Sequence, residues 1–365
     1  MAQLSCGIIG LPNAGKSTLF NALTRGGAQT AAYPFCTIDP NIGVVSVKDP
    51  RLDRVAELAG VERIVYHTVE YVDVAGLVKD ASKGAGRGNQ FLEHVRNCHA
   101  LVHVVRCFDH PDVAHVTGAI SPADDIRTVN LELILADLQT AERAAERVRK
   151  HARRESEAAA ELEILERLEA HLNAEQPARS LEMNEEQRHF LDAYRFLSAK
   201  AVLYAANIGE CDLPGDGSER FKAVASLAAG EGNAVLPICA ELEEELAGLA
   251  PDEAALFLKE MGISEPGLDR LVRETCRMLG LISFFTFNEN EARAWTVPAG
   301  TAAREAAGVI HTDFREKFIR AEVTPFKDFD AAGGPHGARE KGLMRIEGRD
   351  HVVNDGDVIY FRIAP

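Results

Sequence analysis

The residues best suited to chemistry lie near the start of the chain, where residues 10–17 read Gly-Leu-Pro-Asn-Ala-Gly-Lys-Ser. This GxxxxGKS stretch lies between a short apolar run and a helical pattern. Its glycines let successive N–H groups converge on an anion, and the helix start adds a positive dipole end. In such a loop the lysine reaches the β- and γ-phosphates and the hydroxyl binds Mg²⁺. The sequence therefore predicts a nucleoside triphosphate site built from Asn13, Ala14, Gly15, Lys16, Ser17 and Thr18.

Two later stretches are predicted to contact the triphosphate and its metal. Thr37 lies in a polar, proline-containing loop, where switch-type triphosphatases place a threonine that binds Mg²⁺. Asp73 and Gly76 form a DxxG motif at the end of an apolar strand. Its carboxylate is placed to support Mg²⁺ from the outer coordination shell, and the glycine N–H to meet the γ-phosphate. We therefore expect Ser17 and Thr37 as metal ligands, with Asp73 and Gly76 as nucleotide contacts.

The residue after the DxxG motif departs from the pattern of Ras-like proteins. There a glutamine orients the attacking water, whereas this chain has Leu77, which cannot hydrogen-bond through its side chain. Either hydrolysis is slow or another group holds the water. His110 and His115 follow an apolar strand, and we expect His115 to assist Lys16 in catalysis, because histidine can position water at neutral pH. Asn13 could ligate a monovalent cation such as K⁺ beside the phosphates, in place of an arginine finger.

A second departure concerns recognition of the base. GTP-binding proteins carry Asn-Lys-x-Asp after a strand, and the aspartate accepts two N–H bonds from guanine. This chain has Asn-Ile-Gly-Glu at 207–210, so the lysine and the aspartate are both changed. A pocket built for guanine discriminates through its own polar groups, so we expect guanine preference to be lost and adenine to be accepted. The predicted base-site residues are Asn207, Ile208, Glu210, Cys239 and Ala240.

Composition limits the classes of protein that this chain can be. It has 365 residues, 46% hydrophobic and 26% charged, which is typical of a soluble protein with more than one domain. No apolar run reaches the roughly 20 residues that span a bilayer, no signal-peptide features begin the chain, and the seven cysteines form no CxxC pair. We therefore expect a cytoplasmic protein with no membrane contact. The net charge of −16 repels polyanions, so RNA contact requires a local patch.

Two regions could supply such a patch. Six basic residues cluster near the expected turn of a helical hairpin, although a solvated helix face is the simpler interpretation: Arg143, Arg147, Arg149, Lys150, Arg153 and Arg154. Residues 281–365 hold 11 lysines and arginines against 13 aspartates and glutamates, so they repel RNA less than the rest of the chain does. The sequence does not choose between these two regions.

The hydrophobic pattern divides the chain into three parts. Residues 1–128 and 198–280 alternate short apolar strands with helical stretches, as in a parallel α/β sheet. Residues 129–197 contain no glycine and repeat apolar residues at helical spacing, which predicts two long antiparallel helices and a third at 185–197. Residues 281–365 have strand-like runs and glycine-rich loops. The predicted architecture is an α/β P-loop G-type domain, an inserted coiled-coil-like helical hairpin and a C-terminal α+β domain.

Together these motifs resemble the Obg-like ATPases of the YchF type, within the translation-factor-related P-loop GTPases. The resemblance covers nearly the whole chain and rests on GLPNAGKST at 10–18, YPFCTIDPN at 33–41, DVAGLVK at 73–79, ASKG at 81–84, HVVRCF at 103–108, NxxE at 207–210, RAWT at 293–296 and GVIHTDF at 308–314. The last two stretches are similar to the TGS domain, a ubiquitin-like β-grasp module. Asp80 and Cys239 depart from the glycine and serine expected there.

The resemblance implies hydrolysis of ATP in preference to GTP, with Mg²⁺ as cofactor, and association with the ribosome, through its large subunit. It also implies a hydrophobic residue at Leu77 and a histidine near His115 that assists hydrolysis. The chain would act as a switch: ATP orders the loops around Thr37 and Gly76, and hydrolysis to ADP and phosphate releases them. RNA contact would come through the TGS domain or the helical hairpin.

Three alternatives remain open on the sequence alone. One is a GTPase with relaxed base specificity, which competition between ATP and GTP would reveal. A small-molecule kinase would need a catalytic base for an acceptor hydroxyl, and the sequence offers none at a suitable place. In a binding or scaffold protein the nucleotide would be structural, and a Lys16→Ala variant would still bind its partner.

Overall fold

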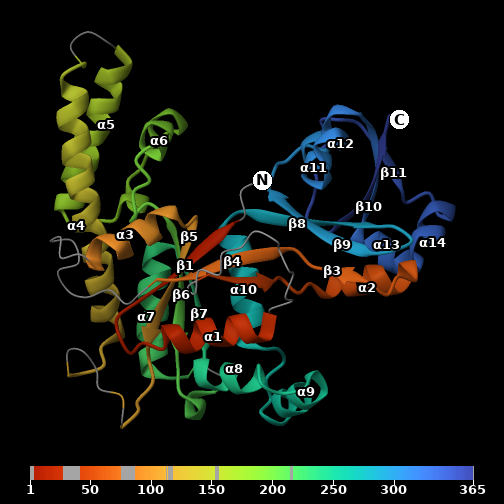
Figure 1. Cartoon of the computed structure of the whole chain (residues 1–365), viewed down its shortest axis with the longest axis horizontal. Coiled ribbons are helices and arrows are strands. Elements are labelled where there is room, and N and C mark those ends of the chain that lie inside the picture. The colour runs from red at the N-terminus through yellow and green to blue at the C-terminus, as the bar shows by residue number, and fades with distance from the viewer. Residues whose placement is uncertain are drawn as a thin grey trace. The chain divides into compact units, whose positions relative to one another are not determined.

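The computed structural model describes residues 4–27, 42–74, 87–111, 113, 118–152, 156–213 and 217–364 (Figure 1). Contacts within the chain divide it into two compact units. One consists of Leu4–Val44 and Glu70–Leu271, and the other contains Val45–Val69 and Val272–Pro365. No helix among the described residues is sufficiently long and apolar to cross a bilayer.

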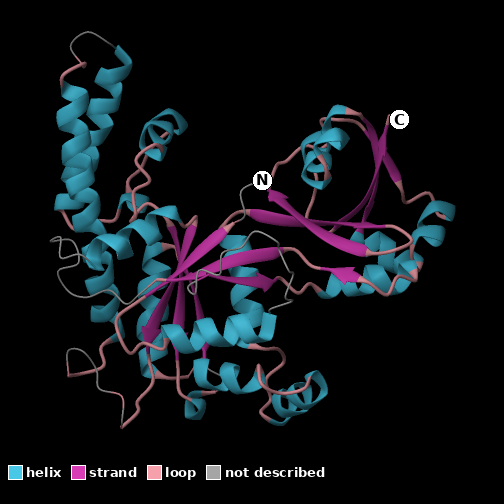
Figure 2. Ribbon diagram, in the orientation of Figure 1, coloured by secondary structure: helices cyan, strands magenta, loops and turns pink. Residues whose placement is uncertain are grey.

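The first unit is built on a six-stranded sheet with the order β2-β4-β1-β5-β6-β7 (Figure 2). The pairs β1–β4, β1–β5, β5–β6 and β6–β7 are all parallel. Every residue of β1 and β5 is buried, as expected for strands covered on both faces. The α/β fold with a mostly parallel sheet, predicted from the sequence, is therefore confirmed. The strands are β1 Ser5–Ile9, β2 Ile42–Ser46, β4 Thr68–Asp73, β5 Ala100–Arg106, β6 Ala201–Asn207 and β7 Ala234–Ile238.

Helices pack around this sheet and complete its core. Apolar side chains of α3, α7, α8 and α9 join those of the strands in one cluster, which includes Leu101, Val202 and Tyr204 from the strands and Val95 and Val224 from the helices. The helices are α1 Lys16–Gly27, α3 Arg87–Asn97, α7 Glu219–Glu231, α8 Ala240–Leu246, α9 Pro251–Glu260 and α10 Gly267–Met278.

The predicted helical insert is a hairpin of α4, Pro122–Arg149, and α5, Ser156–Asn173, which lie side by side (Figure 1). It has its own apolar cluster, to which Leu165 and Leu168 contribute. The first turns of α4 instead pack in the core of the sheet, so this helix connects the hairpin to the α/β part.

The third predicted helix of the insert is shorter than expected. A short 3₁₀ turn, η2 Ala178–Ser180, precedes α6, which spans Glu185–Asp192 rather than residues 185–197. Asn184 starts α6 with a capping box, in which its side chain accepts from Gln187 N at 2.8 Å. Beyond the helix Arg195 adopts a left-handed φ of 49°, which is incompatible with a continuous α-helix.

The second unit contains a six-stranded sheet with the order β11-β10-β12-β8-β9-β3. Phe284 and Phe285 point to opposite faces of β8, and each face has an apolar cluster. Helices α11 and α12 cover the Phe284 face, and α2 and α13 cover the Phe285 face. The elements are α2 Pro50–Ala59, β3 Ile64–Val65, β8 Leu281–Phe287, β9 Ala292–Pro298, α11 Ala303–Ile310, α12 Thr312–Glu316, β10 Phe318–Pro325, α13 Phe326–Ala332, α14 Pro335–Glu340, β11 Arg345–Glu347 and β12 Asp357–Ile363.

Residues 45–69 belong to this second unit although they lie early in the chain. Leu52 and Val55 of α2 pack in the cluster that contains Phe285 and Phe329, and β3 pairs in parallel with β9. This grouping differs from the predicted domain ranges. The amphipathic pattern of α2 shows that one face of the helix is buried, but it does not show which element that face packs against. The ranges 1–128 with 198–280, 129–197 and 281–365 stay a prediction.

Candidate functional site

The loop between β1 and α1 has the backbone geometry of a phosphate-binding loop. Gly10 and Gly15 have φ angles of 146° and 94°, and Asn13 has a left-handed φ of 63°. A Cβ atom on Gly10 would lie 2.4 Å from the carbonyl oxygen of Val104, and one on Gly15 would lie 2.1 Å from Nδ2 of Asn207. Any larger residue at either glycine would therefore displace β5 or Asn207 from the loop.

Lys16 is held inside this loop. Its side chain is only 7% exposed, and Nζ donates to the carbonyl oxygen of Leu11 at 2.8 Å. Burial lowers the pKa of Lys16 to about 8, and the negative charge of Asp73 opposes this shift. Burial also raises the pKa of the Asp73 carboxyl, against the effect of Lys16. The loop thus presents a poorly solvated ammonium group, which an anion would stabilise in its charged form.

Asn207 connects three loops at the carboxyl end of the sheet. It ends β6, is 6% exposed, and donates from Nδ2 to the carbonyl oxygen of Ala14 at 2.9 Å. Its Oδ1 accepts from the backbone N–H of Ala240 at 3.0 Å. A carboxamide donates from its NH₂ group and accepts at its oxygen at the same time, which explains asparagine at this position. The side chain therefore acts on the site through the phosphate loop.

The other predicted base-site residues fall into two groups. Ile208 and Cys239 are buried in the core cluster, and burial raises the pKa of the Cys239 thiol to about 11. The N–H of Ile208 donates to the carbonyl of Ile238 at 2.9 Å. Glu210 is exposed and begins a short 3₁₀ turn, η3 Glu210–Asp212. Direct contact of these residues with a base stays a prediction.

The predicted metal site is described only in part. Ser17 is exposed and Thr18 is half-buried, both in the first turn of α1, and Asp73 ends the strand beside β1. A hydroxyl and a carboxylate are hard oxygen donors of the kind that Mg²⁺ prefers, so the residues present fit this ion. Within the described ranges, no three His, Cys, Asp or Glu side chains gather in a metal-binding group. The remaining residues singled out in the sequence lie outside the described residues: Thr37, Gly76, Leu77, Asp80 and His115.

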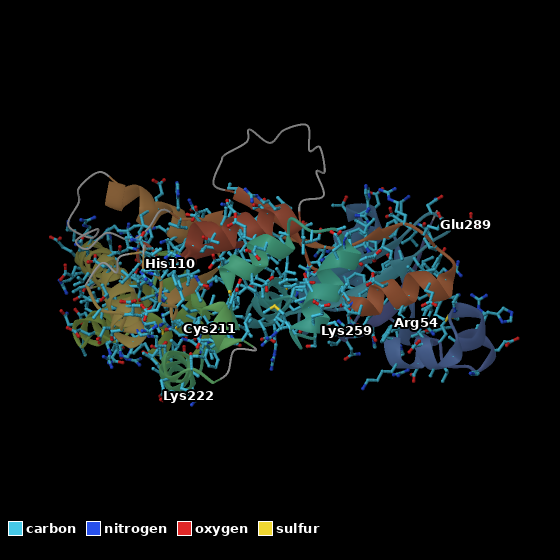
Figure 3. The ribbon with its side chains drawn as sticks, turned by 90° about the horizontal axis from the view of Figure 1, so that it is seen from below. Arg54, His110, Cys211, Lys222, Lys259 and Glu289 are labelled. Carbon is cyan, nitrogen blue, oxygen red and sulfur yellow. The ribbon has the colours of Figure 1, made fainter. Side chains whose placement is uncertain are left out.

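Arg106 is a residue whose role the sequence did not reveal. It ends β5, is buried, and donates from Nη2 to the carbonyl oxygen of Val113 at 2.7 Å. Its guanidinium also lies 4.7 Å from the ring centre of Phe108. These contacts connect Phe108 and Val113 to the end of β5, on either side of the exposed His110 that Figure 3 labels. An arginine at the end of a fully buried strand was the available signal, because a buried guanidinium requires partners.

The fold and the site define a P-loop nucleotide-binding protein of the GTPase superfamily. A glycine-rich loop joins the first strand to a helix, an aspartate ends the neighbouring strand, and an asparagine from β6 holds the loop. These groups converge at the carboxyl ends of parallel strands, where open α/β sheets bind their ligands.

The chain belongs to the YchF family. It is 48% identical over 361 residues to the "Ribosome-binding ATPase YchF" of Bacillus subtilis (strain 168), covering 98% of this chain and 99% of that one. The protein of the same name from Escherichia coli O157:H7 is 48% identical over 360 residues, covering 98% of each. Residues 281–364 match the YchF-GTPase C-terminal family, described as a protein of unknown function, and residues 5–154 match the family described as 50S ribosome-binding GTPase. The resemblance drawn from the motifs is confirmed.

Solved structures agree with this assignment. The structure of the Schizosaccharomyces pombe YchF GTPase is 32% identical with a TM-score of 0.88, covering 99% of this chain and 98% of that one. The GTP-binding protein from Pyrococcus horikoshii OT3 is 21% identical with a TM-score of 0.61, over 99% of this chain and 100% of that one, and shows the fold alone.

Proposed function

We propose that this protein is a nucleotide-dependent switch that hydrolyses ATP to ADP and phosphate and acts at the ribosome in the cytoplasm. The observation that carries the proposal is the buried Lys16, held on its own loop carbonyl within a glycine-rich loop that Asn207 braces. An incoming phosphate would replace the Leu11 carbonyl as the partner of this ammonium group. The printed name of the bacterial relatives, ribosome-binding ATPase, supports both the reaction and the partner.

In this mechanism the loop stabilises charge on the phosphates rather than forming covalent bonds. Backbone N–H groups of residues 13–18 and Lys16 bind the phosphate oxygens, and the Gly76 N–H meets the γ-phosphate. Mg²⁺ supplies further charge neutralisation when it is bound by Ser17 and Thr37. Asp73 orients this region through its charge beside Lys16.

Water attacks the γ-phosphate in this proposal, and Leu77 cannot hold that water. We assign the role to His115, and we assign to Asn13 a monovalent cation, K⁺, beside the phosphates. A His115→Ala variant is expected to slow single-turnover hydrolysis about 100-fold while nucleotide affinity changes little. Equal turnover would remove His115 from the mechanism, and equal rates in K⁺ and Na⁺ would remove the cation.

The preference for adenine follows from the residues of the predicted base site. It is supported by Ile208, whose side chain is buried where the guanine-type motif has a lysine beside the base, and by the longer acid Glu210. GTP is a second candidate, because the printed title of the Schizosaccharomyces pombe structure calls that relative a GTPase. Calorimetric competition between ATP and GTP decides this point, and tight GDP with negligible ADP binding would reverse the assignment.

For contact with RNA of the ribosome we favour the second unit over the helical hairpin. In the hairpin, Arg149 is paired with Glu166 at 3.0 Å, and Arg147 lies over the ring of Tyr194. These pairs support the interpretation of that basic cluster as a solvated helix face. Two basic residues named with them, Arg153 and Arg154, lie outside the described residues.

In the second unit, strands β10 and β12 carry a more suitable surface. Buried Glu322 accepts from Arg362 at 3.0 Å and from Arg320 at 3.2 Å, so both exposed guanidinium groups are held in place. Arg362 also lies 4.3 Å from the ring centre of the exposed Tyr360. Ordered arginines beside an aromatic ring bind phosphates and stack on bases. Co-sedimentation with ribosomes in ADP, in ATP and in a non-hydrolysable analogue tests partner and switch together.

A further inference from the structure

The segment of residues 194–200, which leaves the helical insert and leads into β6, is bound to the end of α3. Lys200 Nζ donates to the carbonyl oxygens of Arg96, at 3.1 Å, and of Cys98. The last carbonyl groups of a helix have no partner within it, and a cation there meets the negative end of the helix dipole. Lys200 therefore closes α3 from outside the helix.

Arg96 strengthens this connection from the helix side. Its Nη1 donates to the carbonyl oxygens of Tyr194 at 3.1 Å and Arg195 at 3.3 Å, and Arg195 donates to Oδ1 of Asn97 at 3.5 Å. The hydroxyl of Tyr194 in turn donates to Glu161 of α5 at 2.5 Å. The segment thus contacts α3 on one side and the hairpin on the other.

A buried carboxylate attaches the same segment to α4. Asp137 is 0% exposed and accepts from the backbone N–H of Leu197 at 2.8 Å. It also accepts from both the N–H and the hydroxyl of Ser198, each at 2.7 Å. Burial raises the pKa of Asp137, and these donors oppose that shift. Since breaking such contacts leaves buried polar groups unpaired, the segment and α4 are expected to move together.

A pocket of about 310 Å³ lies between α3 and α4, beside apolar residues of both helices that belong to one core cluster. Its lining includes Leu92, Glu93 and Arg96 from α3, and Ala136, Gln139 and Thr140 from α4. The hydrogen-bonded segment 194–200 adds a polar connection between α3 and α4 to this shared apolar core.

We propose that residues 194–200 transmit a movement of α3 to the helical insert, with Lys200 as the positioning residue of this connection. In the chain, α3 is the next described element after Asp73, whose charge acts on Lys16 in the phosphate site. A change of nucleotide that shifts α3 would carry the segment with it, and Asp137 would pass that shift to α4. The inference rests on the proposed nucleotide switch and adds the route by which the insert responds to it.

Hydrogen–deuterium exchange on the full chain tests this route, with ADP compared against a non-hydrolysable ATP analogue. In the unaltered protein we expect exchange to differ between the two states at the phosphate loop, in α3 and in the α4–α5 hairpin. In Lys200→Met the difference at the phosphate loop remains, while that in the hairpin falls to about half or less. Lys200→Arg keeps donors at this position and should restore the response.

Lys222→Met is the matched control, because this exposed lysine of α7 pairs with Glu219 of its own helix at 2.9 Å (Figure 3). An undiminished hairpin response in Lys200→Met would overturn the proposal. So would an unaltered protein whose phosphate loop responds while its hairpin does not. No response at the phosphate loop would instead refute the nucleotide switch and the route with it. If Lys200→Met does not fold, Arg96→Gln removes the opposite half of the connection and is judged by the same outcomes.

Discussion

Asn207 reaches from the end of β6 to the phosphate loop, where its Nδ2 donates to the carbonyl oxygen of Ala14 at 2.9 Å. Its second bond, from the N–H of Ala240, fixes the start of α8 by the same side chain. One carboxamide therefore sets the distance between the loop that would bind phosphates and the loop expected beside the base. The two halves of the nucleotide site are mechanically joined.

Replacing Asn207 by Asp is expected to weaken nucleotide binding about 10- to 100-fold. The carboxylate would keep the acceptor for Ala240 but would face the Ala14 carbonyl without a proton to donate, at a cost of about 1–3 kcal/mol. Titration calorimetry with ADP measures the effect. Asn233→Asp, in the turn before β7, should bind nucleotide as the unaltered protein does. Affinity within a factor of about 2 for Asn207→Asp would contradict this account.

The pKa of Lys16, lowered to about 8 by burial, predicts how nucleotide binding depends on pH. Below this value the free protein already carries the ammonium group that phosphates need. Above it the lysine is increasingly neutral, so binding must take up a proton and affinity should decline. Calorimetry at pH 8.5 in buffers of different ionisation enthalpy should reveal this uptake, and a Lys16→Met variant should lack it. Binding without proton uptake at that pH would refute the assignment.

The lowered pKa of Lys16 also determines the direction in which folding stability changes with pH. A lysine whose folded pKa lies below its unfolded value, 10.5 here, binds fewer protons in the folded state between the two values. The free energy of unfolding contributed by Lys16 should therefore rise as pH increases from about 8 toward 10.5. Lys16→Met should lose this contribution when unfolding is compared across that window.

The raised pKa of Glu243 should change folding stability with pH in the direction opposite to that of Lys16. It is buried on α8 and accepts from the N–H of Gly267 at 2.6 Å, at the start of α10. Burial raises its pKa to about 7 from the ordinary 4.5, so the folded state binds more protons in this interval and loses stability as pH rises through it.

Glu243→Gln keeps an oxygen acceptor for Gly267 and removes the charge. Its melting temperature should therefore fall less than that of the unaltered protein between pH 5 and pH 8. Glu245→Gln, at an exposed position on the same helix, serves as the control and should follow the unaltered protein. A Glu243→Gln variant with the unaltered pH profile would show that the carboxyl does not titrate in this range.

The surface formed by Arg320, Tyr360 and Arg362 predicts a localised effect on ribosome association. Arg362→Gln removes a guanidinium that would bind phosphate and frees Glu322 from one partner, so we expect about a tenfold loss of association. Lys341→Gln, an exposed cation of the same unit, should lose much less. Co-sedimentation at two salt concentrations measures both variants. Equal losses would indicate a general charge effect, and no loss would direct attention to the hairpin.

The sequence by itself was sufficient for the elements whose physical signal is local. The glycines, lysine and serine of the phosphate loop, the short apolar strands of the parallel sheet, and the glycine-free hairpin were all recognised from spacing and composition. Each depends on interactions within one strand, one turn or one helix. For the same reason the family resemblance could be drawn from short motifs, and comparison over the full chain confirmed it.

Only the tertiary structure shows which groups each buried side chain contacts. The sequence predicts Asn207 as a base contact, and the structure adds that its side chain binds the phosphate loop. The sequence gave no indication that Arg106 donates to the Val113 carbonyl. The assignment of α2 to the second unit and the connection from Lys200 to α3 are of the same kind. Periodicity and composition show that a group will be buried or paired. They do not identify the group that it contacts. That group is distant in the sequence and comes close only when the chain folds and its sheets and helices pack together.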